Sequence, residues 1–283
     1  MKTGLVLEGG AMRGMFTAGV IDVMLENEIT FDGAIGVSAG AVFGCNYKSK
    51  QIGRAIRYNM KYCRNPRYAS LWSLLLTGNF YGKKFCYETL PEKLDIFDTE
   101  TYQKNPMGFY VVSTDVVTGK PVYTKCDGGG REDLEWFRAS ASMPLASKIV
   151  KIGDGKYLDG GIADSVPLKY FQSIGYEKNI VVLTQPEDFK KEPNSLLPII
   201  KRVYRKYPKF VDAVAKRHDV YNDNIKYIKE QESSGSAFVI RPPQALGIGA
   251  REKNPDNLKR VYDLGRKTAE ENLEKMIEFL KGE

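Results

Sequence analysis

The sequence is poor in the residues that most often bind metals. Among its 283 residues there is one histidine, His218, and there are four cysteines. A single histidine excludes a histidine-rich metal site, and the spacings of Cys45, Cys63, Cys86 and Cys126 match no metal-site template. A chain of this length can build its core without disulfides, so we expect free thiols, no metal and no cofactor.

Long apolar runs are missing as well. The most apolar window, residues 71–76, is far too short to cross a bilayer, and Glu8 interrupts the first apolar run. We therefore expect a cytoplasmic protein without a signal peptide or a membrane span. A hydrophobic content of 42% is enough for one large core. The aromatic run from Trp72 to Tyr81 predicts a core-packed helix, with a lid or wall of a lipid pocket as the alternative.

The net charge of +7 is concentrated in one segment. Residues 190–229 hold eleven lysines and arginines but four aspartates and glutamates. Such a surface attracts anionic partners, for example phospholipid headgroups or nucleic acid. Apolar residues are interleaved with the basic ones, so the segment can also pack on the core and expose a solvated face. We favour that interpretation, keep peripheral contact with anionic membranes as the alternative, and expect no nucleic-acid partner.

A serine-centred turn organises the first part of the chain. Residues 33–37 predict a short strand, and the residues after Ser38 predict a helix. Gly36 and Gly40 complete a Gly-x-Ser-x-Gly pattern, which is typical of a serine on a strained strand-to-helix corner. The glycines leave room for the turn, and the N-terminus of the helix would stabilise an oxyanion beside the serine. Ser38 is therefore the candidate nucleophile.

A glycine-rich turn precedes this corner. Residues 3–7 predict the first strand and residues 15–28 a helix, which together with the strand at 33–37 make a right-handed βαβ unit. Since parallel strands end at the same edge of a sheet, we expect the turn from Gly9 to Gly14 close to Ser38. Its backbone N–H groups can point into one concavity and form an oxyanion hole.

Two Asp-Gly-Gly sequences compete for the role of the base. Asp127 continues into charged residues, which predicts a solvated loop, whereas Asp159 lies between apolar segments. We therefore favour Asp159. His218 would complete a Ser–Asp–His order, but it lies between Arg217 and Asp219 in a basic helical stretch and is better explained as a solvated surface residue.

Taken in chain order, these motifs resemble the patatin-like phospholipases. The resemblance covers roughly residues 3–185 and includes 138–144, which is similar to the Ala-Ser-rich segment of those proteins. Residues 241–243 and 261–266 resemble the ending of one bacterial branch of that family. The resemblance implies a three-layer α/β/α fold with a mostly parallel central sheet. It also implies one domain over residues 1–283, with a core at about 3–185 and an extension at about 186–283.

The resemblance also implies the chemistry. Ser38 would be the nucleophile of a Ser–Asp dyad, with Asp159 as its partner and no metal or cofactor. The oxyanion hole would consist of Gly9, Gly10, Ala11 and Arg13, where Ala11 replaces a glycine that is frequent in the family. The remaining motif positions are Gly14, Gly36, Gly40, Gly160 and Gly161.

The expected activity is that of a lipid acyl hydrolase of the phospholipase A or lysophospholipase type. Such an enzyme cleaves a carboxylic ester through an acyl-enzyme, so the expected partner is a lipid or another acyl ester. One alternative is a non-lipid esterase or thioesterase that uses the same dyad. Another is a catalytically silent scaffold that binds acidic membranes through residues 190–229.

Overall fold

The fold is built on one sheet whose central strands are parallel. A computed structural model describes residues 1–282. The strands are β1 (Lys2–Leu7), β2 (Gly33–Val37), β3 (Gly108–Asp115), β4 (Pro121–Lys125), β5 (Val150–Ile152), β6 (Gly155–Asp159), β7 (Tyr176–Val182) and β8 (Ala237–Ile240). They follow the order β5-β6-β3-β2-β1-β7-β8, with β4 also paired to β3. The neighbouring strands β3, β2, β1, β7 and β8 are parallel to one another. The pairs β3–β4, β3–β6 and β5–β6 are antiparallel.

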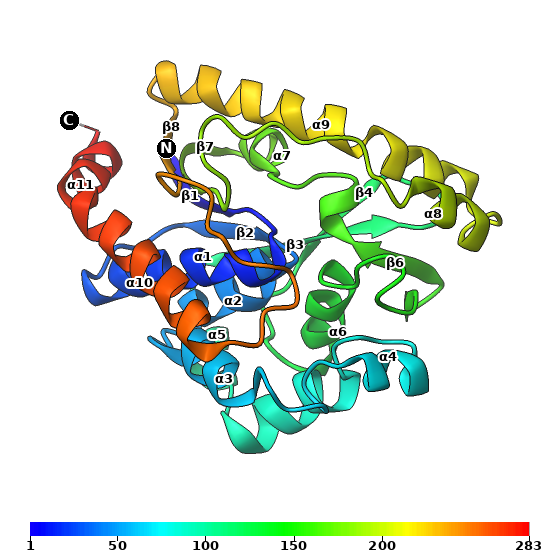
Figure 1. Cartoon of the computed structure of the whole chain (residues 1–283). Coiled ribbons are helices and arrows are strands. Elements are labelled where there is room, and N and C mark those ends of the chain that lie inside the picture. The colour runs from blue at the N-terminus through cyan, green and yellow to red at the C-terminus, as the bar shows by residue number, and fades with distance from the viewer. Residues whose placement is uncertain (283) are drawn as a thin grey trace.

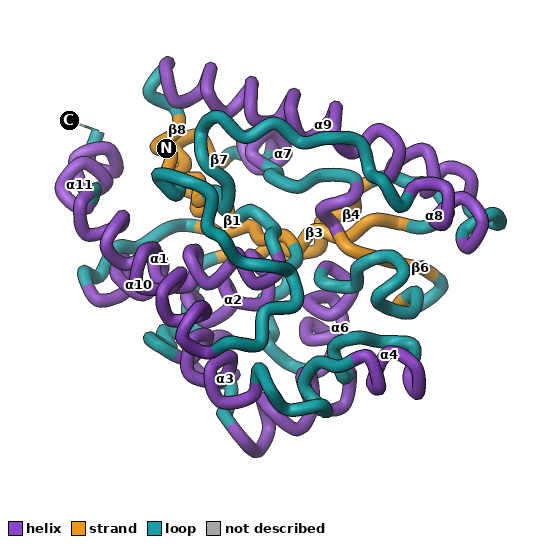
Figure 2. Tube along the Cα trace, viewed as in Figure 1, coloured by secondary structure: helices purple, strands orange, loops and turns teal. Residues whose placement is uncertain are grey.

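Helices cover both faces of the sheet (Figure 1). One layer contains α1 (Gly14–Glu26), α2 (Ala39–Lys48), α3 (Arg54–Tyr62), α6 (Arg131–Ser140) and α10 (Pro255–Glu271). The other contains α7 (Leu168–Ser173) and the long α9 (Pro208–Ser233), which crosses the top of the view in Figure 2. This arrangement confirms the three-layer α/β/α class.

Shorter elements lie at the edges of these layers. They are the 3-10 turns η1 (Ala11–Arg13) and η3 (Gly160–Ile162), the π-helical η2 (Phe85–Leu94), and the helices α4 (Leu71–Thr77), α5 (Thr99–Lys104), α8 (Leu197–Val203) and α11 (Leu273–Lys281). The strands expected at 3–7 and 33–37 are confirmed, and the helix expected at 15–28 corresponds to α1. The final helix is divided at Asn272 into α10 and α11.

Alternating side chains of the strands build a core on each face of the sheet. Leu5 and Leu7 of β1 pack with the layer of α1, α2 and α10, whereas Val6 between them packs with α7 and α9. The middle of the sheet is buried on both faces, which explains the continuous apolar runs in β2 and at the end of β7.

Candidate active site

Ser38 lies on the sharp corner between β2 and α2. Its φ of 53° and ψ of −118° are rare for a residue other than glycine. The flanking glycines make the corner possible. A Cβ on Gly36 would lie 2.6 Å from the backbone N of Ala41, and a Cβ on Gly40 would lie 2.4 Å from the carbonyl O of Leu7. The strained corner predicted from the sequence is therefore present.

A hydrogen bond joins Ser38 to Asp159. Ser38 Oγ donates to Asp159 Oδ2 at 2.8 Å, and the amide of Gly161 donates to Asp159 Oδ1, also at 2.8 Å. Both side chains of the pair are buried. The sheet brings them together, because β6 ends at Asp159 and pairs with β3, which lies next to β2. Two residues that are 121 positions apart thus meet at one edge of the sheet.

The surroundings of Asp159 raise its affinity for a proton. Burial raises the pKa of Asp159, while the positive charge of Arg217 and the hydrogen bonds from Ser38 and Gly161 oppose that rise. The net effect is a pKa above the ordinary value of an aspartate. A carboxylate with a raised pKa is a better acceptor for the proton of a serine hydroxyl.

Two further serines hold Ser38 and Asp159 in place. The amide of Ser38 donates to Ser140 Oγ at 2.8 Å, and the amide of Asp159 donates to the carbonyl O of Ser142 at 2.8 Å. Both belong to the segment 138–144, which the sequence analysis noted for its composition without giving it a contact. The separation of Ser140 from Ser38 leaves no local signal for this bond.

The glycine-rich turn packs directly against Ser38. A Cβ on Gly9 would lie 3.1 Å from Ser38 Cβ, and a Cβ on Gly10 would lie 2.6 Å from Thr184 Oγ1. Within residues 1–282, the amide N–H groups of Gly9 and Gly10 have no hydrogen-bond partner. Ala11 adopts a φ of 48°, so alanine accepts a strained backbone here. Unpaired donors beside a nucleophile are the geometry that an oxyanion hole requires.

Asp127 of the competing Asp-Gly-Gly sequence is engaged in ion pairs. Its carboxylate accepts hydrogen bonds from Lys48 Nζ at 2.7 Å and from the amide of Phe109 at 2.9 Å, and Lys125 Nζ lies 2.7 Å away. The Lys48 side chain is only 2% exposed. Gly128, Gly130 and Arg131 are exposed, as expected for a solvated loop, but the ion pair between Asp127 and the buried Lys48 was not predicted.

His218 contacts neither Ser38 nor Asp159. Its Nε2 lies 3.4 Å from Oδ1 of Asp219 on the same helix, and its Nδ1 has no hydrogen-bond partner among residues 1–282. The Ser–Asp–His order in the sequence is thus not assembled into a triad. Across the same residues, no group of three His, Cys, Asp or Glu side chains could hold a metal ion.

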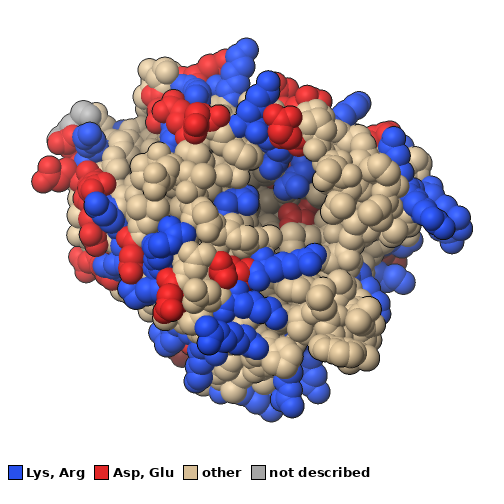
Figure 3. Space-filling model, in the orientation of Figure 1, with Lys and Arg blue, Asp and Glu red and all other residues tan. Residues whose placement is uncertain are grey.

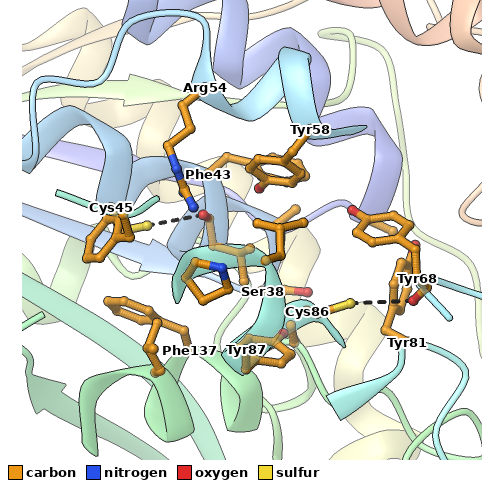
Figure 4. A pocket seen from close by; sticks show the side chains of 18 of the residues that line it. Ser38, Phe43, Cys45, Arg54, Tyr58, Tyr68, Tyr81, Cys86, Tyr87 and Phe137 are labelled. Carbon is orange, nitrogen blue, oxygen red and sulfur yellow. Dashed lines mark hydrogen bonds between the residues drawn. The ribbon is translucent and has the colours of Figure 1, made fainter. Parts of the chain in front are cut away.

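Two cavities open at Ser38. The first, the apolar cavity, lies between α2, α3, η2 and α6 and is partly open to solvent. Figure 4 shows Ser38 facing it together with the aromatic rings of its wall, which come from Phe43, Tyr58, Tyr68, Tyr81, Tyr87 and Phe137. Arg54 also reaches this wall, but its guanidinium donates to the carbonyl O of Asp95 and to Asn46 Oδ1. Its charge is therefore already engaged.

The second, the basic cavity, is also partly open to solvent and shares Ala11, Ser38 and Met143 with the first. Its distinctive lining residues are charged: Glu8, Arg13, Asp159, Lys191 and Arg217. Figure 3 shows it as a hollow with basic atoms around its rim and acidic atoms inside. Of these residues, the sequence analysis singled out Arg13 and Asp159 for the site, whereas Lys191 and Arg217 were counted only as part of a basic segment.

The basic segment 190–229 is divided between three environments. Its apolar residues Ile200, Tyr204 and Phe210 are buried in the core, as we favoured. Ile199 and Val203 are exposed on α8. Lys191 and Arg217, in contrast, line the basic cavity, so the expectation of a solvated face is wrong for these two charges.

The helix α4 is not packed in the core, contrary to the interpretation that we favoured. Leu71, Trp72, Leu75 and Leu76 are between 60% and 80% exposed. The residues on either side of α4 in the chain, Tyr68 and Tyr81, line the apolar cavity. Within residues 1–282, no helix has the length and apolarity needed to cross a membrane.

Comparison with known proteins agrees with this geometry. The family model described as patatin-like phospholipase matches residues 5–171. The chain belongs to the patatin-like phospholipase family. A second model, described as a domain of unknown function (DUF6363), matches residues 207–281, which include α9 and α10.

Individual relatives are distant. The uncharacterized protein YjjU of Escherichia coli (strain K12) is 28% identical over 281 residues, which are 94% of this chain and 75% of YjjU. The lysophospholipase NTE1 of Chaetomium globosum is 25% identical over 179 residues, which are 62% of this chain but only 11% of NTE1. The crystal structure of VipD from Legionella pneumophila aligns with a TM-score of 0.44 at 13% identity, over 95% of this chain and 67% of VipD.

Proposed function

We propose that this protein hydrolyses lipid esters through a dyad of Ser38 and Asp159. Membership of the patatin-like phospholipase family and the lysophospholipases among the relatives support a lipid ester as the substrate. The observation that carries the proposal is the 2.8 Å hydrogen bond from Ser38 Oγ to Asp159 Oδ2, at the junction of the two cavities.

In the proposed reaction, Asp159 takes the proton of Ser38 as Oγ attacks the ester carbonyl carbon. The amide N–H groups of Gly9 and Gly10 stabilise the resulting oxyanion, since both are unpaired, Gly9 lies against Ser38, and Gly10 lines the same cavity as Ser38. Collapse of the intermediate expels the alcohol, which takes the proton back from Asp159. Water then attacks the acyl-enzyme with Asp159 as the base, which releases the fatty acid and restores Ser38.

The apolar cavity is the proposed site of the acyl chain. Its wall of aromatic and aliphatic side chains offers no unpaired charge, because Arg54 is engaged by main-chain and side-chain oxygens. An alkyl chain buried there gains about 25 cal/mol for each Å² removed from water. A lipid chain therefore suits this cavity better than a short polar acyl group, which favours a lipid hydrolase over a non-lipid esterase or thioesterase on the same dyad.

The proposal extends to the setting of the enzyme. We propose one folded unit over residues 1–283 in the cytoplasm, in peripheral contact with anionic membranes. Exposed Trp72, Leu75 and Leu76 on α4, near the residues that line the apolar cavity, support the membrane contact. A silent scaffold is disfavoured, because the strained Ser38 corner and the buried carboxylate beside it are costly features that binding alone does not need.

The experiment that tests the proposal is hydrolysis of a lysophospholipid by matched serine variants. Ser38→Ala removes the nucleophile and should lower kcat by at least about 10³-fold. Ser173→Ala is the control, because Ser173 is exposed and its Oγ only donates to the carbonyl O of Tyr170. Equal activity of both variants would contradict the assignment of Ser38.

A further inference from the structure

The basic cavity contains three cationic side chains that converge from separate parts of the chain. Arg13 ends the η1 turn, Lys191 lies in the loop before α8, and Arg217 lies on α9. All three line the same hollow as Ser38. A grouping of like charges beside a nucleophile is costly unless a ligand neutralises it.

Two of these cations, Arg217 and Lys191, are held in place by their surroundings. Arg217 Nε donates to the carbonyl O of Gly161, next to the catalytic carboxylate. The backbone of Lys191 is tied to Asn222 of α9, since Lys191 N donates to Asn222 Oδ1 at 2.9 Å and Asn222 Nδ2 donates to the carbonyl O of Lys191 at 3.1 Å. Lys191 Nζ then lies 4.4 Å from the ring centroid of Tyr221. The site is therefore built by α9 rather than by free surface side chains.

The two acidic residues of the cavity offset the charges of these three cations only in part. Glu8 accepts hydrogen bonds from the amide of Thr184 at 2.5 Å and from the hydroxyl of Tyr221 at 3.0 Å. Asp159 is occupied by Ser38 and Gly161. Within residues 1–282, none of the three cations has an ion pair within 4.0 Å.

Two further observations indicate that the positive charge of this cavity is not fully compensated by the protein. Arg13 Nε is buried without a hydrogen-bond partner among the described residues. Burial lowers the pKa of Lys191 to about 8, and the charges of Arg217 and Arg13 contribute to the lowering, whereas Glu8 opposes it. An anion bound between the three side chains would relieve both penalties.

We propose that Arg13, Lys191 and Arg217 form a subsite for a phosphate group next to Ser38. Guanidinium groups present paired N–H donors that match phosphate oxygens, and an ammonium adds a point charge. The inference rests on the proposed function, because it assigns the two ends of the proposed lipid ester to the two cavities. The acyl chain lies in the apolar cavity, the ester carbonyl at Ser38, and a phosphate on the alcohol part of the ester in the basic cavity. Free phosphate has the same chemistry and is the second source of the ligand.

Lys191→Met is the variant that tests the subsite. Arg13 lies beside the oxyanion loop and Arg217 beside Asp159, so changes there would also disturb catalysis. Methionine keeps much of the volume of lysine and removes the charge. Lys190→Met is the matched control, because Lys190 is the neighbouring residue, is exposed and does not line the cavity.

The first measurement compares two substrates with the same acyl chain, lysophosphatidic acid and monoacylglycerol. The ratio of their kcat/KM values reports recognition of the phosphate. Lys191→Met should lower this ratio by about tenfold or more, since a hydrogen bond to a charged group is lost, while Lys190→Met should leave it as in the wild type.

The second measurement follows thermal unfolding with sodium phosphate against sodium chloride at equal ionic strength. Phosphate should raise the Tm of the wild type and of Ser38→Ala, and raise it less for Lys191→Met. This readout needs no turnover, so it tests the subsite even if Ser38 is not the nucleophile.

The two measurements together decide the proposal and the source of the phosphate. A changed substrate ratio identifies the phosphate of the ester substrate. An unchanged ratio with a Tm shift that Lys191→Met abolishes supports a site for free phosphate. If Lys191→Met and Lys190→Met give the same ratio and phosphate shifts no Tm, the subsite is disproved. If the wild type hydrolyses neither substrate but phosphate still raises its Tm, the proposed function is contradicted and the subsite is not.

Discussion

The chain contains the tripeptide Asp-Gly-Gly twice, and the two copies have opposite roles. At residues 127–129, the aspartate lies between two lysines, one of them buried, and accepts a hydrogen bond from the amide of Phe109 near the start of β3. At residues 159–161, the aspartate is buried beside Ser38 with its nearest positive charge on Arg217. The same three residues therefore form a structural ion pair in one place and the proposed base of a hydrolase in the other.

The two carboxylates differ in the direction of their pKa shifts. Burial raises the pKa of Asp127, but the hydrogen bonds from Lys125 and Lys48 outweigh it, and the net pKa is lowered. Burial dominates at Asp159, and its net pKa is raised. A lowered pKa means that the folded state favours the charged form, whereas a raised pKa means that the fold tolerates it at a cost. The ionised carboxylate of Asp127 thus stabilises the folded state, whereas the ionised carboxylate of Asp159 destabilises it.

The largest expected effect that separates the two aspartates is on activity. Asp159→Asn should lower kcat by about 10²–10⁴-fold. The asparagine Oδ1 can still accept from Gly161, but its Nδ2 would donate to Ser38 Oγ, so the serine has no base. The folded state should be at least as stable as the wild type at neutral pH, since the buried charge is gone.

Asp154→Asn is the control for this variant. Asp154 is exposed in the turn between β5 and β6 and lines neither cavity. It should keep wild-type rates of ester hydrolysis. An Asp159→Asn protein that hydrolyses as fast as Asp154→Asn would remove Asp159 from the mechanism.

The second expected effect is on stability at Asp127. Asp127→Asn leaves Lys48 buried without its counter-charge, which should lower the free energy of unfolding by about 1–3 kcal/mol after allowance for the exposed part of the carboxyl. Activity below the melting temperature should stay within a few-fold of the wild type.

The pH dependence of the stability difference follows from the lowered pKa of Asp127. The contribution of Asp127 is full above the unfolded pKa of about 3.9 and disappears as the pH falls through the lower folded pKa. Chemical denaturation of wild type and Asp127→Asn at pH 7 and at pH 3 measures this. A difference that stays constant with pH would show that the ion pair is not its source.

The last expected effect, of similar size, concerns the first glycine of each tripeptide. A Cβ on Gly160 would lie 2.1 Å from the carbonyl O of Val112, whereas a Cβ on Gly128 would meet only Asp133 Oδ2 at 3.5 Å. Gly160→Ala should therefore lower the free energy of unfolding by about 1–3 kcal/mol, and Gly128→Ala should change it little. Thermal unfolding compares them, and equal stabilities would mean that the packing around η3 is looser than described.

Much of this site could be predicted from the sequence because its parts are local. Strand, turn and helix patterns around Ser38 identify the corner, and apolar neighbours distinguish Asp159 from Asp127. The first βαβ unit follows from the same alternation of strands and helices, whereas the three-layer α/β/α class was implied by the resemblance to the patatin-like phospholipases. Even so, the role of Asp127 was missed, because its lysine partner Lys48 lies 79 residues earlier in the chain.

The residues that could not be predicted act over long distances. Ser140 reaches the amide of Ser38 only after α6 packs beside α2. In the sequence, Arg217 and Lys191 cannot be distinguished from the other charges of the basic segment. Only the packing of α9 and of the loop before α8 brings them to the basic cavity. The exposure of α4 could not be predicted either. Its leucines and tryptophan are typical of a core helix, and only the tertiary structure shows that they are exposed.

The most direct test of the Ser38–Asp159 dyad is covalent labelling with a fluorophosphonate, mapped by peptide mass spectrometry. A serine is labelled fast when a base removes its proton and donors hold the phosphonyl oxygen. The dyad predicts one adduct, on Ser38, with much slower labelling in Asp159→Asn and unchanged labelling in Asp154→Asn. An adduct on a different serine, or labelling that persists undiminished in Ser38→Ala, would contradict it.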